Sequence, residues 1–315
     1  MQKGQANVAA TISFADRVVI VTGGGRGLGA AYAVELARRG AAVVVHDSGA
    51  SPDGTGSDPG PAVKVAADIV AAGGRAQACI TDASTPEGGR AAIDLAITHF
   101  GRLDVVVANA GIVHSGPFED WSTERFEAQL RHHLLAAFHV VRPAFAMMKA
   151  AGYGRLVFVS SAAGVFGQPG LVGYATAKTG MLGLMNVAAI EGAEFGITAN
   201  TVMPMADTRM ASALLGEAAE TPDARGFLET LRVDQVAPVV AYLASEHCMM
   251  THTVLSAFAG RVAAVQIGVT HGWSRPGLRF TAEDVEAHLP EIMNADQILV
   301  PQSIFDEMSY ATASG

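Results

Sequence analysis

Residues 17–40 of this chain read RVVIVTGGGRGLGAAYAVELARRG. The β-branched run Arg17–Val21 predicts a buried strand, and the alanine-rich segment Ala30–Arg39 predicts a helix. The glycine-rich turn between them lets the backbone approach a pyrophosphate, and the start of the helix offers unpaired N–H groups to the anion. An ordinary glycine turn is the alternative. In this strand, turn and helix context we interpret residues 22–29 as a dinucleotide site.

A second apolar strand, Ala42–His46, leads into Asp47, about 20 residues past the glycine turn, where a ribose-binding carboxylate is expected. There Asp47 can accept hydrogen bonds from both adenosine ribose hydroxyls and repels a 2′-phosphate. Arg26 inside the turn argues the other way, because a guanidinium can contact such a phosphate. We give Asp47 the greater weight and predict NAD rather than NADP as the cofactor.

Further strands and helices alternate along the chain. Strands are expected at 76–81, 103–108, 156–159, 197–203 and 262–267, and helices at 64–72, 87–100, 124–149 and 233–244. This alternation predicts an α/β fold, a Rossmann-type doubly wound parallel sheet of about seven strands with helices on both faces. Ligands of such sheets bind at the carboxyl ends of the strands, where the chain places Thr22, Asp47, Asp82, Asn109, Ser161 and Pro204. Asp82 either caps the following turn or meets the adenine amino group.

Composition narrows the classes of function. The apolar fraction is 50%, the formal net charge is −9, and no basic run is present. This balance argues against binding to nucleic acid or to an anionic membrane and favours a small-molecule substrate. The start of the chain lacks a signal-peptide pattern, and no apolar run reaches the ~20 residues of a membrane span. We therefore expect a cytoplasmic protein without a metal site, in which Cys79 and Cys248 are reduced packing residues.

The chain is expected to hold one main domain. We predict an N-terminal leader at 1–16, a dinucleotide-binding catalytic domain at 17–272, and a C-terminal extension at 273–315. Within the domain, 205–231 suits either a mobile lid or a plain surface helix pair. The long helix at 124–149 could bury one face on the sheet and another on a partner subunit, and the small residues after Lys178 indicate a close helix contact at the sheet or at a dimer interface. A homodimer or homotetramer is expected. The extension packs on its own or a neighbouring subunit, or is disordered.

The stretch from Leu156 to Lys178 carries the candidate chemistry. An apolar strand ends at Ser161, and Tyr174 then lies one helical turn before Lys178 on the same face. A nearby ammonium lowers the pKa of a phenol, which would make Tyr174 a usable proton carrier. The Ser161 hydroxyl could hold the oxygen of a reacting carbonyl or alcohol. Taken alone, the Tyr-x-x-x-Lys spacing is more often solvated surface packing.

Together, the glycine turn, Asn109-Ala110-Gly111, Ser161, Tyr174 and Lys178 resemble the short-chain dehydrogenase/reductase family over residues 17 to about 273. The resemblance implies that Tyr174 is the general acid/base, that Lys178 lowers its pKa and binds the nicotinamide ribose, and that Ser161 orients the substrate oxygen. The cofactor-binding positions assigned on this basis are Thr22, Gly23, Arg26, Gly27, Leu28, Gly29, Asp47, Asp82, Asn109, Ala110, Gly111, Tyr174, Lys178 and Pro204.

One position departs from the family pattern. The family usually places an asparagine in the long central helix, and here the matching segment carries His133. This puts the water-mediated proton relay at that position in doubt. His133 either keeps a hydrogen-bonding role or is a structural histidine.

Within the family, the chain is most similar to the (3R)-hydroxyacyl-CoA dehydrogenase unit of peroxisomal multifunctional β-oxidation enzymes. The similarity rests on Val43–Asp47 with the glycine loop after it, on His133, on Ala189–Gly192 and on Arg209-Met210. It implies an NAD-linked oxidoreductase that acts on a secondary alcohol or ketone, with a 3-hydroxyacyl-CoA as the expected substrate. The alternatives are a dehydrogenase for another ketone (steroid, sugar or acyl-carrier-protein substrate) and a non-catalytic dinucleotide-binding protein.

Overall fold

The structure is a computed structural model that describes residues 11–208, 226, 228–275 and 277–313. The chain forms two compact units, Met1–Ala263 and Ala264–Gly315, which we describe separately. The sequence predicts the change of domain a few residues later, at 272–273. Most of the predicted lid segment lies outside the described residues.

The first unit is built on an eight-stranded sheet with the order β3-β2-β1-β4-β5-β6-β7-β8. The pairs from β3 through to β7 are all parallel. The strands are β1 (Val18–Thr22), β2 (Ala42–His46), β3 (Arg75–Cys79), β4 (Val105–Ala108), β5 (Gly154–Val159), β6 (Ile197–Pro204), β7 (Thr253–Phe258) and β8 (Arg261–Val265). The predicted Rossmann-type fold is confirmed.

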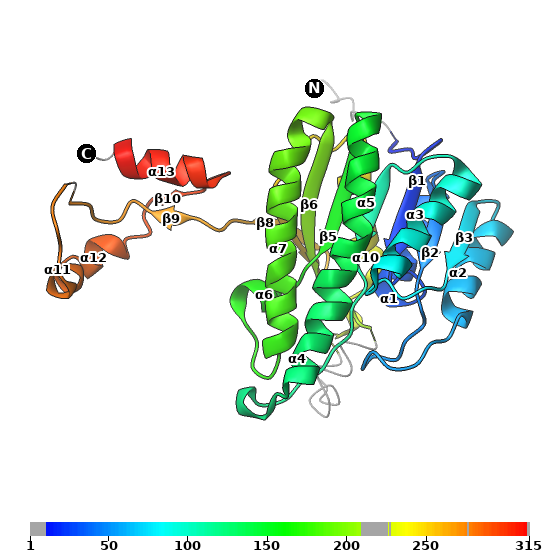
Figure 1. Ribbon diagram of the computed structural model, residues 1–315, viewed down its shortest axis with the longest axis horizontal. Coiled ribbons are helices and arrows are strands. Elements are labelled where there is room, and N and C mark those ends of the chain that lie inside the picture. Colours follow the sequence, from blue (N-terminus) through cyan, green and yellow to red (C-terminus); the bar gives the residue numbers. More distant parts are fainter. Residues whose placement is uncertain (1–10, 209–225, 227, 276, 314–315) are drawn as a thin grey trace, which may run out of the picture. The chain divides into compact units, whose positions relative to one another are not determined.

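Helices cover both faces of this sheet (Figure 1). One face is covered by α1 (Gly27–Arg38), α2 (Gly60–Ala71) and α10 (Val233–Ala244), and the other by α3 (Pro86–Phe100), α5 (Ala136–Ala151) and α7 (Val172–Gly192). Short helical segments lie at η1 (Phe118–Asp120), α6 (Ala162–Phe166) and η3 (Ala193–Phe195). Because both faces are covered, the central strands are continuous apolar runs rather than alternating ones.

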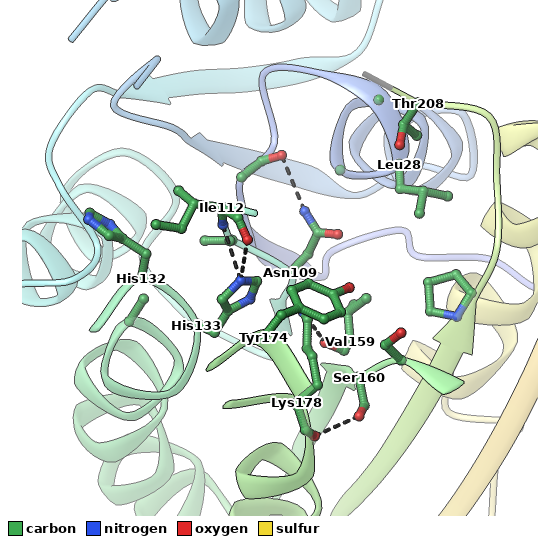
Figure 2. A pocket seen from close by; sticks show the side chains of 18 of the residues that line it. Leu28, Asn109, Ile112, His132, His133, Val159, Ser160, Tyr174, Lys178 and Thr208 are labelled. Atoms are coloured by element: carbon green, nitrogen blue, oxygen red, sulfur yellow. Dashed lines mark hydrogen bonds between the residues drawn. The ribbon is translucent and has the colours of Figure 1, made fainter. Parts of the chain in front are cut away.

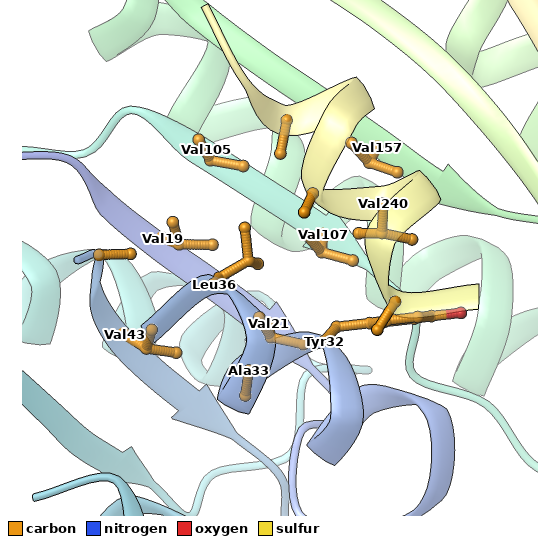
Figure 3. Close-up of a cluster of buried hydrophobic side chains, with 14 of the residues drawn as sticks. Val19, Val21, Tyr32, Ala33, Leu36, Val43, Val105, Val107, Val157 and Val240 are labelled. Carbon is orange, nitrogen blue, oxygen red and sulfur yellow. The ribbon is translucent and has the colours of Figure 1, made fainter. Parts of the chain in front are cut away.

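The core between the sheet and the α1/α10 layer is shown in Figure 3. Val19 and Val21 of β1 pack there with Tyr32 and Leu36 of α1 and with Val240 of α10, and all five are fully buried. Every residue of β1 is buried, so its alternate side chains serve the two opposite faces. This rigid centre sets the position of the turn that follows β1.

The seventh strand differs from the prediction. The strand that pairs with β6 is Thr253–Phe258, and the predicted strand at 262–267 instead overlaps β8, the outermost strand of the sheet. β7 is half-buried and contains Thr253 and Ser256. It therefore lacks the continuous apolar run from which a buried strand is predicted. The two strands are joined by Ala259 and Gly260, both with positive φ, as in a two-residue hairpin turn.

The predicted long helix is interrupted by a π-helical turn. α4 (Thr123–Leu130) continues through the π turn η2 (Arg131–Leu135) into α5. By length and hydropathy the whole helix, Thr123–Ala151, could cross a membrane, but it packs against β4, β5 and α7 as a core helix of this fold does. Such π turns are often found at functional sites, and this one carries His133.

The second unit contains short elements. A two-stranded antiparallel sheet joins β9 (Val269–Thr270) to β10 (Ile298–Leu299), and the helices are α11 (Ala282–Ala287), α12 (Leu289–Ile292) and α13 (Ile304–Ala313). The helix start predicted at Thr281 is confirmed, since the Thr281 and Asp284 side chains form a capping box. Trp273 stacks on His288 at 4.1 Å between ring centroids.

The end of the predicted leader is part of the core. The Phe14 side chain is 1% exposed and packs in the cluster of α1 and β1, and its N–H donates to the Arg39 carbonyl. We expect Phe14→Ala to lower the free energy of unfolding by about 3–5 kcal/mol, because it leaves a cavity. Urea denaturation measures the change. Phe118→Ala, at a side chain 76% exposed, is the control, and equal losses in both variants would contradict this packing.

Candidate active site

A cavity of about 370 Å³ opens at the carboxyl ends of the strands, within the first unit. β1 and β4 are neighbours in the sheet, and the strand order reverses between them. Open α/β sheets bind their ligands at this switch point. The lining includes most of the predicted residues, among them Gly23, Arg26, Gly27, Leu28, Gly29, Asp47, Asp82, Asn109, Ala110, Gly111, Ser161, Tyr174, Lys178 and Pro204.

The glycine turn has a shape that only glycine allows. Gly23 has φ +63°, and a Cβ at Gly29 would lie 2.0 Å from the carbonyl oxygen of Gly23. α1 begins at Gly27, and the side chain of the preceding Arg26 makes no capping hydrogen bond to it. The first N–H groups of α1 therefore suit an anion, and the turn fits the pyrophosphate of a dinucleotide.

Asn109 ties β4 to the glycine turn. Its side-chain amide donates to the carbonyls of Thr22 (2.9 Å) and Gly23 (3.3 Å). In return, the Thr22 hydroxyl accepts from the N–H groups of Asn109 (2.9 Å) and Ala110 (3.0 Å). Thr22 is buried and does not itself line the cavity. Thr22 and Asn109 therefore shape this part of the cavity mainly by holding the ends of β1 and β4 together.

Asp47 lies at the end of β2, with its carboxylate facing the turn. One oxygen accepts from the Gly25 N–H (2.8 Å) and the other from the Gly49 N–H (2.7 Å). A carboxylate oxygen accepts more than one hydrogen bond, so both oxygens keep capacity for ribose hydroxyls. The structure thus places Asp47 where the sequence predicts a ribose contact.

Arg26 is held by the loop that follows Asp47. Its guanidinium donates to the carbonyls of Gly49 (3.3 Å) and Ala50 (3.2 Å), and it pairs with Asp58 at 3.4 Å. The loop also reaches the far side of the cleft, where the Pro52 carbonyl accepts from the Val113 N–H (3.0 Å). The sequence shows only that a glycine-containing loop follows Asp47, and the fold shows which residues that loop contacts.

Asp82 fulfils the capping alternative and also lines the cavity. Its two oxygens accept from the Ser84 N–H and from the Ser84 hydroxyl, each at 2.8 Å, which closes a turn. The N-cap of α3 itself is Thr85, whose side chain accepts from the Gly88 N–H. Because Asp82 faces the cavity as well, both roles considered from the sequence are compatible with its position.

Ser161, Tyr174 and Lys178 meet at one wall of the cavity (Figure 2 shows Tyr174 and Lys178). Ser161 is the N-cap of α6 and accepts from the Ala163 N–H. Tyr174 and Lys178 lie one turn apart on α7, and the Lys178 Nζ sits 5.6 Å from the centre of the Tyr174 ring. Lys178 donates to the Val159 carbonyl at 2.8 Å, so the end of β5 fixes its ammonium group.

The pKa of Tyr174 moves in the direction opposite to the expectation. Burial raises the pKa of Tyr174, and hydrogen bonding to Ser161 only partly offsets this. Burial also lowers the pKa of Lys178 to about 7. A low-dielectric wall disfavours the phenolate and the ammonium alike. The expectation from the sequence included only the attraction between these two charges.

The long helix places His133 in this wall, and its Gln129 binds the backbone of the neighbouring residues Ile112 and His114. His133 lies in the π turn, 1% exposed, with its ring edge against Tyr174 at 5.2 Å between centroids. Gln129, fully buried and one turn earlier, has its amide oriented to donate to the Ile112 carbonyl (3.3 Å) and accept from the His114 N–H (3.0 Å). The sequence singles out His133, but nothing in it points to Gln129.

Residues 17–218 match the family model of the short chain dehydrogenases. The chain belongs to the short-chain dehydrogenase/reductase family. The glycine turn, Asn109 and Tyr174 all lie within the matched residues.

Named relatives agree with this assignment. A Mycobacterium tuberculosis protein, named as a short-chain type dehydrogenase/reductase, is 40% identical over 279 residues, which is 88% of this chain and 94% of that protein. The peroxisomal multifunctional enzyme type 2 of Mus musculus is 36% identical over 299 residues, which is 94% of this chain but 39% of the mouse enzyme. The solved full-length enzyme of the same name from Drosophila melanogaster superposes with a TM-score of 0.78 at 28% identity, over 96% of this chain and 50% of that one.

The lowered pKa of Lys178 can be tested through stability. The folded-state pKa of about 7 lies below the unfolded value of about 10.4. The buried ammonium therefore destabilises the fold below pH ~7, and this penalty disappears as the pH rises toward about 10. We expect the free energy of unfolding of the wild type to rise relative to that of Lys178→Met over this range, measured by urea denaturation. Lys64→Met, on the exposed face of α2, is the control. If the difference in free energy of unfolding between the wild type and Lys178→Met stayed constant over this pH range, the lowered pKa of Lys178 would be refuted.

Proposed function

We propose that this protein is an NAD-dependent dehydrogenase that oxidises a secondary alcohol, with a 3-hydroxyacyl-CoA as the substrate. The observation that carries the proposal is the convergence of Ser161, Tyr174 and Lys178 beside the glycine turn, in one cavity. A hydride acceptor held on that turn would lie next to an acid/base group and a hydroxyl that can hold the reacting oxygen.

In this mechanism the alcohol oxygen binds between the hydroxyls of Ser161 and Tyr174. Tyr174, ionised, takes the hydroxyl proton while the hydrogen on the carbinol carbon leaves as hydride. Bound NAD supplies the hydride acceptor at its nicotinamide ring. Lys178, held by the Val159 carbonyl, supports the tyrosinate by its charge and can hydrogen-bond the nicotinamide ribose.

The preference for NAD is supported by the two side chains that compete for the adenosine ribose. Asp47 presents a carboxylate there, which favours free hydroxyls and repels a 2′-phosphate. Arg26, the group that could bind such a phosphate, already donates to Gly49 and Ala50 and pairs with Asp58. These contacts use three of the five N–H donors of the guanidinium and pair its charge with Asp58, which weakens its attraction for a 2′-phosphate.

The proposed substrate class is supported by the apolar wall near Tyr174 and by the relatives. Ala163 and Leu171 line the cavity beside Tyr174, with which they form a buried apolar cluster, and this surface suits the acyl chain beside a 3-hydroxyl group. The similarity to the mouse multifunctional enzyme covers 94% of this chain but 39% of that enzyme. We also propose a homo-oligomer, supported by the exposed Val187 and Ile190 on α7.

Tyr174→Phe tests the mechanism. We expect kcat to fall at least about a hundredfold, because the general acid/base is removed, while NADH binding changes little. NADH formation is followed with a panel of 3-hydroxyacyl-CoA thioesters, steroids and sugars, and NADH affinity by fluorescence titration. Thr176→Val, on the exposed face of the same helix, is the control. Near-wild-type turnover by Tyr174→Phe with any accepted alcohol would refute the mechanism. If the wild type turned over steroids or sugars but none of the thioesters, the proposed substrate class would be wrong.

Asp47→Asn tests the cofactor preference. The wild type should bind NADH at least tenfold more tightly than NADPH, about 1.4 kcal/mol, and the variant should lose most of that ratio. Dissociation constants of both cofactors measure this. Asp53→Asn makes the same charge change in the adjoining loop without lining the cavity, so its ratio should stay that of the wild type. Tighter binding of NADPH by the wild type would contradict the preference.

A further inference from the structure

A second, buried serine directly precedes the candidate catalytic one. Ser160 is 2% exposed, and its N–H donates to the Val202 carbonyl of β6 (2.9 Å), so its main chain is part of the sheet. Val159 packs against the α1/α10 layer, and alternation along the strand turns the next side chain, Ser160, toward α7. A hydroxyl buried at such a place is costly unless it is hydrogen-bonded.

The partner of this hydroxyl is the main chain of Lys178. The Ser160 hydroxyl donates to the Lys178 carbonyl at 2.7 Å (Figure 2). α7 continues to Gly192, so that carbonyl also accepts the regular helical hydrogen bond, and Ser160 uses its second lone pair. The helix does not need this bond to complete its own hydrogen bonding. The bond joins α7 to the end of β5.

Two further contacts join the same segments. The Lys178 ammonium donates to the Val159 carbonyl at 2.8 Å, and the Thr179 hydroxyl donates to the Gly164 carbonyl of α6. A Cβ at Gly164 would lie 2.9 Å from the Thr179 nitrogen, so only glycine allows α6 to approach α7 this closely. We call these three contacts the clamp, with Val159, Ser160 and Gly164 on one side and Lys178 and Thr179 on the other.

The clamp encloses the groups that are proposed to react. Ser161 lies between Ser160 and Gly164 in the chain, and Tyr174 lies one helical turn before Lys178. The Ser161 hydroxyl is hydrogen-bonded to Tyr174. A shift of α7 along β5 would therefore separate these two hydroxyls while leaving both side chains intact.

We propose that Ser160 is a positioning residue, which holds α7 so that Tyr174 and Lys178 stay aligned with the Ser161 hydroxyl. It acts through the main chain of Lys178, because its own hydroxyl proton is committed to that carbonyl and its side chain is buried. The two consecutive serines thus have different tasks, one toward the substrate oxygen and one toward the helix. The inference rests on the proposed catalytic roles of Ser161 and Tyr174.

Ser160→Ala removes the hydroxyl and leaves no unpaired carbonyl, since the helical bond to Lys178 remains. We expect kcat for the accepted alcohol to fall about tenfold, because the reacting groups are misaligned but still present. KM and the dissociation constant for NADH should change less than about twofold. Steady-state kinetics and fluorescence titration measure these quantities.

The pKa of Lys178 gives a second readout that needs no substrate. Lys178 is one of four lysines in the chain, so NMR titration of 13C-lysine-labelled protein without cofactor resolves it. Ser160→Ala should lower the pKa of Lys178 by about 0.5, since the ammonium stays buried while its contact with the Val159 carbonyl loosens. The titratable groups near the ammonium, Tyr174 and His133, are unchanged in this variant.

Ser245→Ala is the matched control for a merely structural role. The Ser245 hydroxyl donates to the Tyr242 carbonyl, also at 2.7 Å, and Ser245 is 1% exposed. It lies outside the residues that line the cavity. In urea denaturation Ser245→Ala should destabilise the protein about as much as Ser160→Ala, while kcat and the pKa of Lys178 stay those of the wild type.

Thr179→Val tests the other end of the clamp at an exposed position, so the test does not depend on a core substitution. It should reduce kcat about threefold and also lower the pKa of Lys178. Thr176→Val is its matched control, because the Thr176 hydroxyl donates within α7, to the Val172 carbonyl (2.8 Å). This control should leave both quantities unchanged.

Wild-type kcat in Ser160→Ala, or a Lys178 pKa that is not lowered in either Ser160→Ala or Thr179→Val, would overturn the positioning role. The same decrease of the Lys178 pKa in Ser245→Ala would overturn it as well. If the wild type oxidised no alcohol of the panel but Ser160→Ala lowered the pKa of Lys178, the proposed function would fail and the clamp would be supported.

Discussion

The hydrogen bonds between Thr22 and Asn109 are the constraint on which the rest of the site depends. They join β1 to β4 at the one place where the strand order reverses. The contact is so close that a Cβ at Gly23 would lie 2.9 Å from the Cα of Ala110. With the strands locked at this separation, the glycine turn, the start of α1 and the Asn-Ala-Gly segment keep fixed positions around one cavity.

Burial then determines the chemistry of the opposite wall. Tyr174, Lys178 and His133 are all buried. Burial raises the pKa of Tyr174 and lowers those of Lys178 and His133, which favours the neutral form of each group. Lys178, with a pKa of about 7, can carry or release its proton near neutral pH. Every hydrogen bond that stabilises its charge therefore matters for the acidity of Tyr174. The π turn that carries His133 contributes to the same wall.

Much of the fold and most of the site could be predicted from the sequence. Buried parallel strands such as β2 are continuous apolar runs that end at a polar side chain, so Asp47 was placed correctly at its strand end. β7 was missed because a strand with Thr253 and Ser256 carries no apolar run, and its pairing with β6 is set by the sheet. The direction of the Tyr174 shift was missed because desolvation depends on what covers a side chain, which spacing along a helix does not reveal.

By itself, the sequence determined the alternation of strands and helices as far as β6, the glycine turn, and Ser161, Tyr174 and Lys178 as candidate site residues, because these depend on local spacing and on backbone freedom at glycine. Only the tertiary structure decided how those groups behave. It engaged Arg26 with the loop after Asp47, and it set the unpaired Nδ1 of His133 in the wall beside Tyr174. Contacts between distant segments and the burial they create arise only when the chain folds, and they decide hydrogen-bond partners and pKa values.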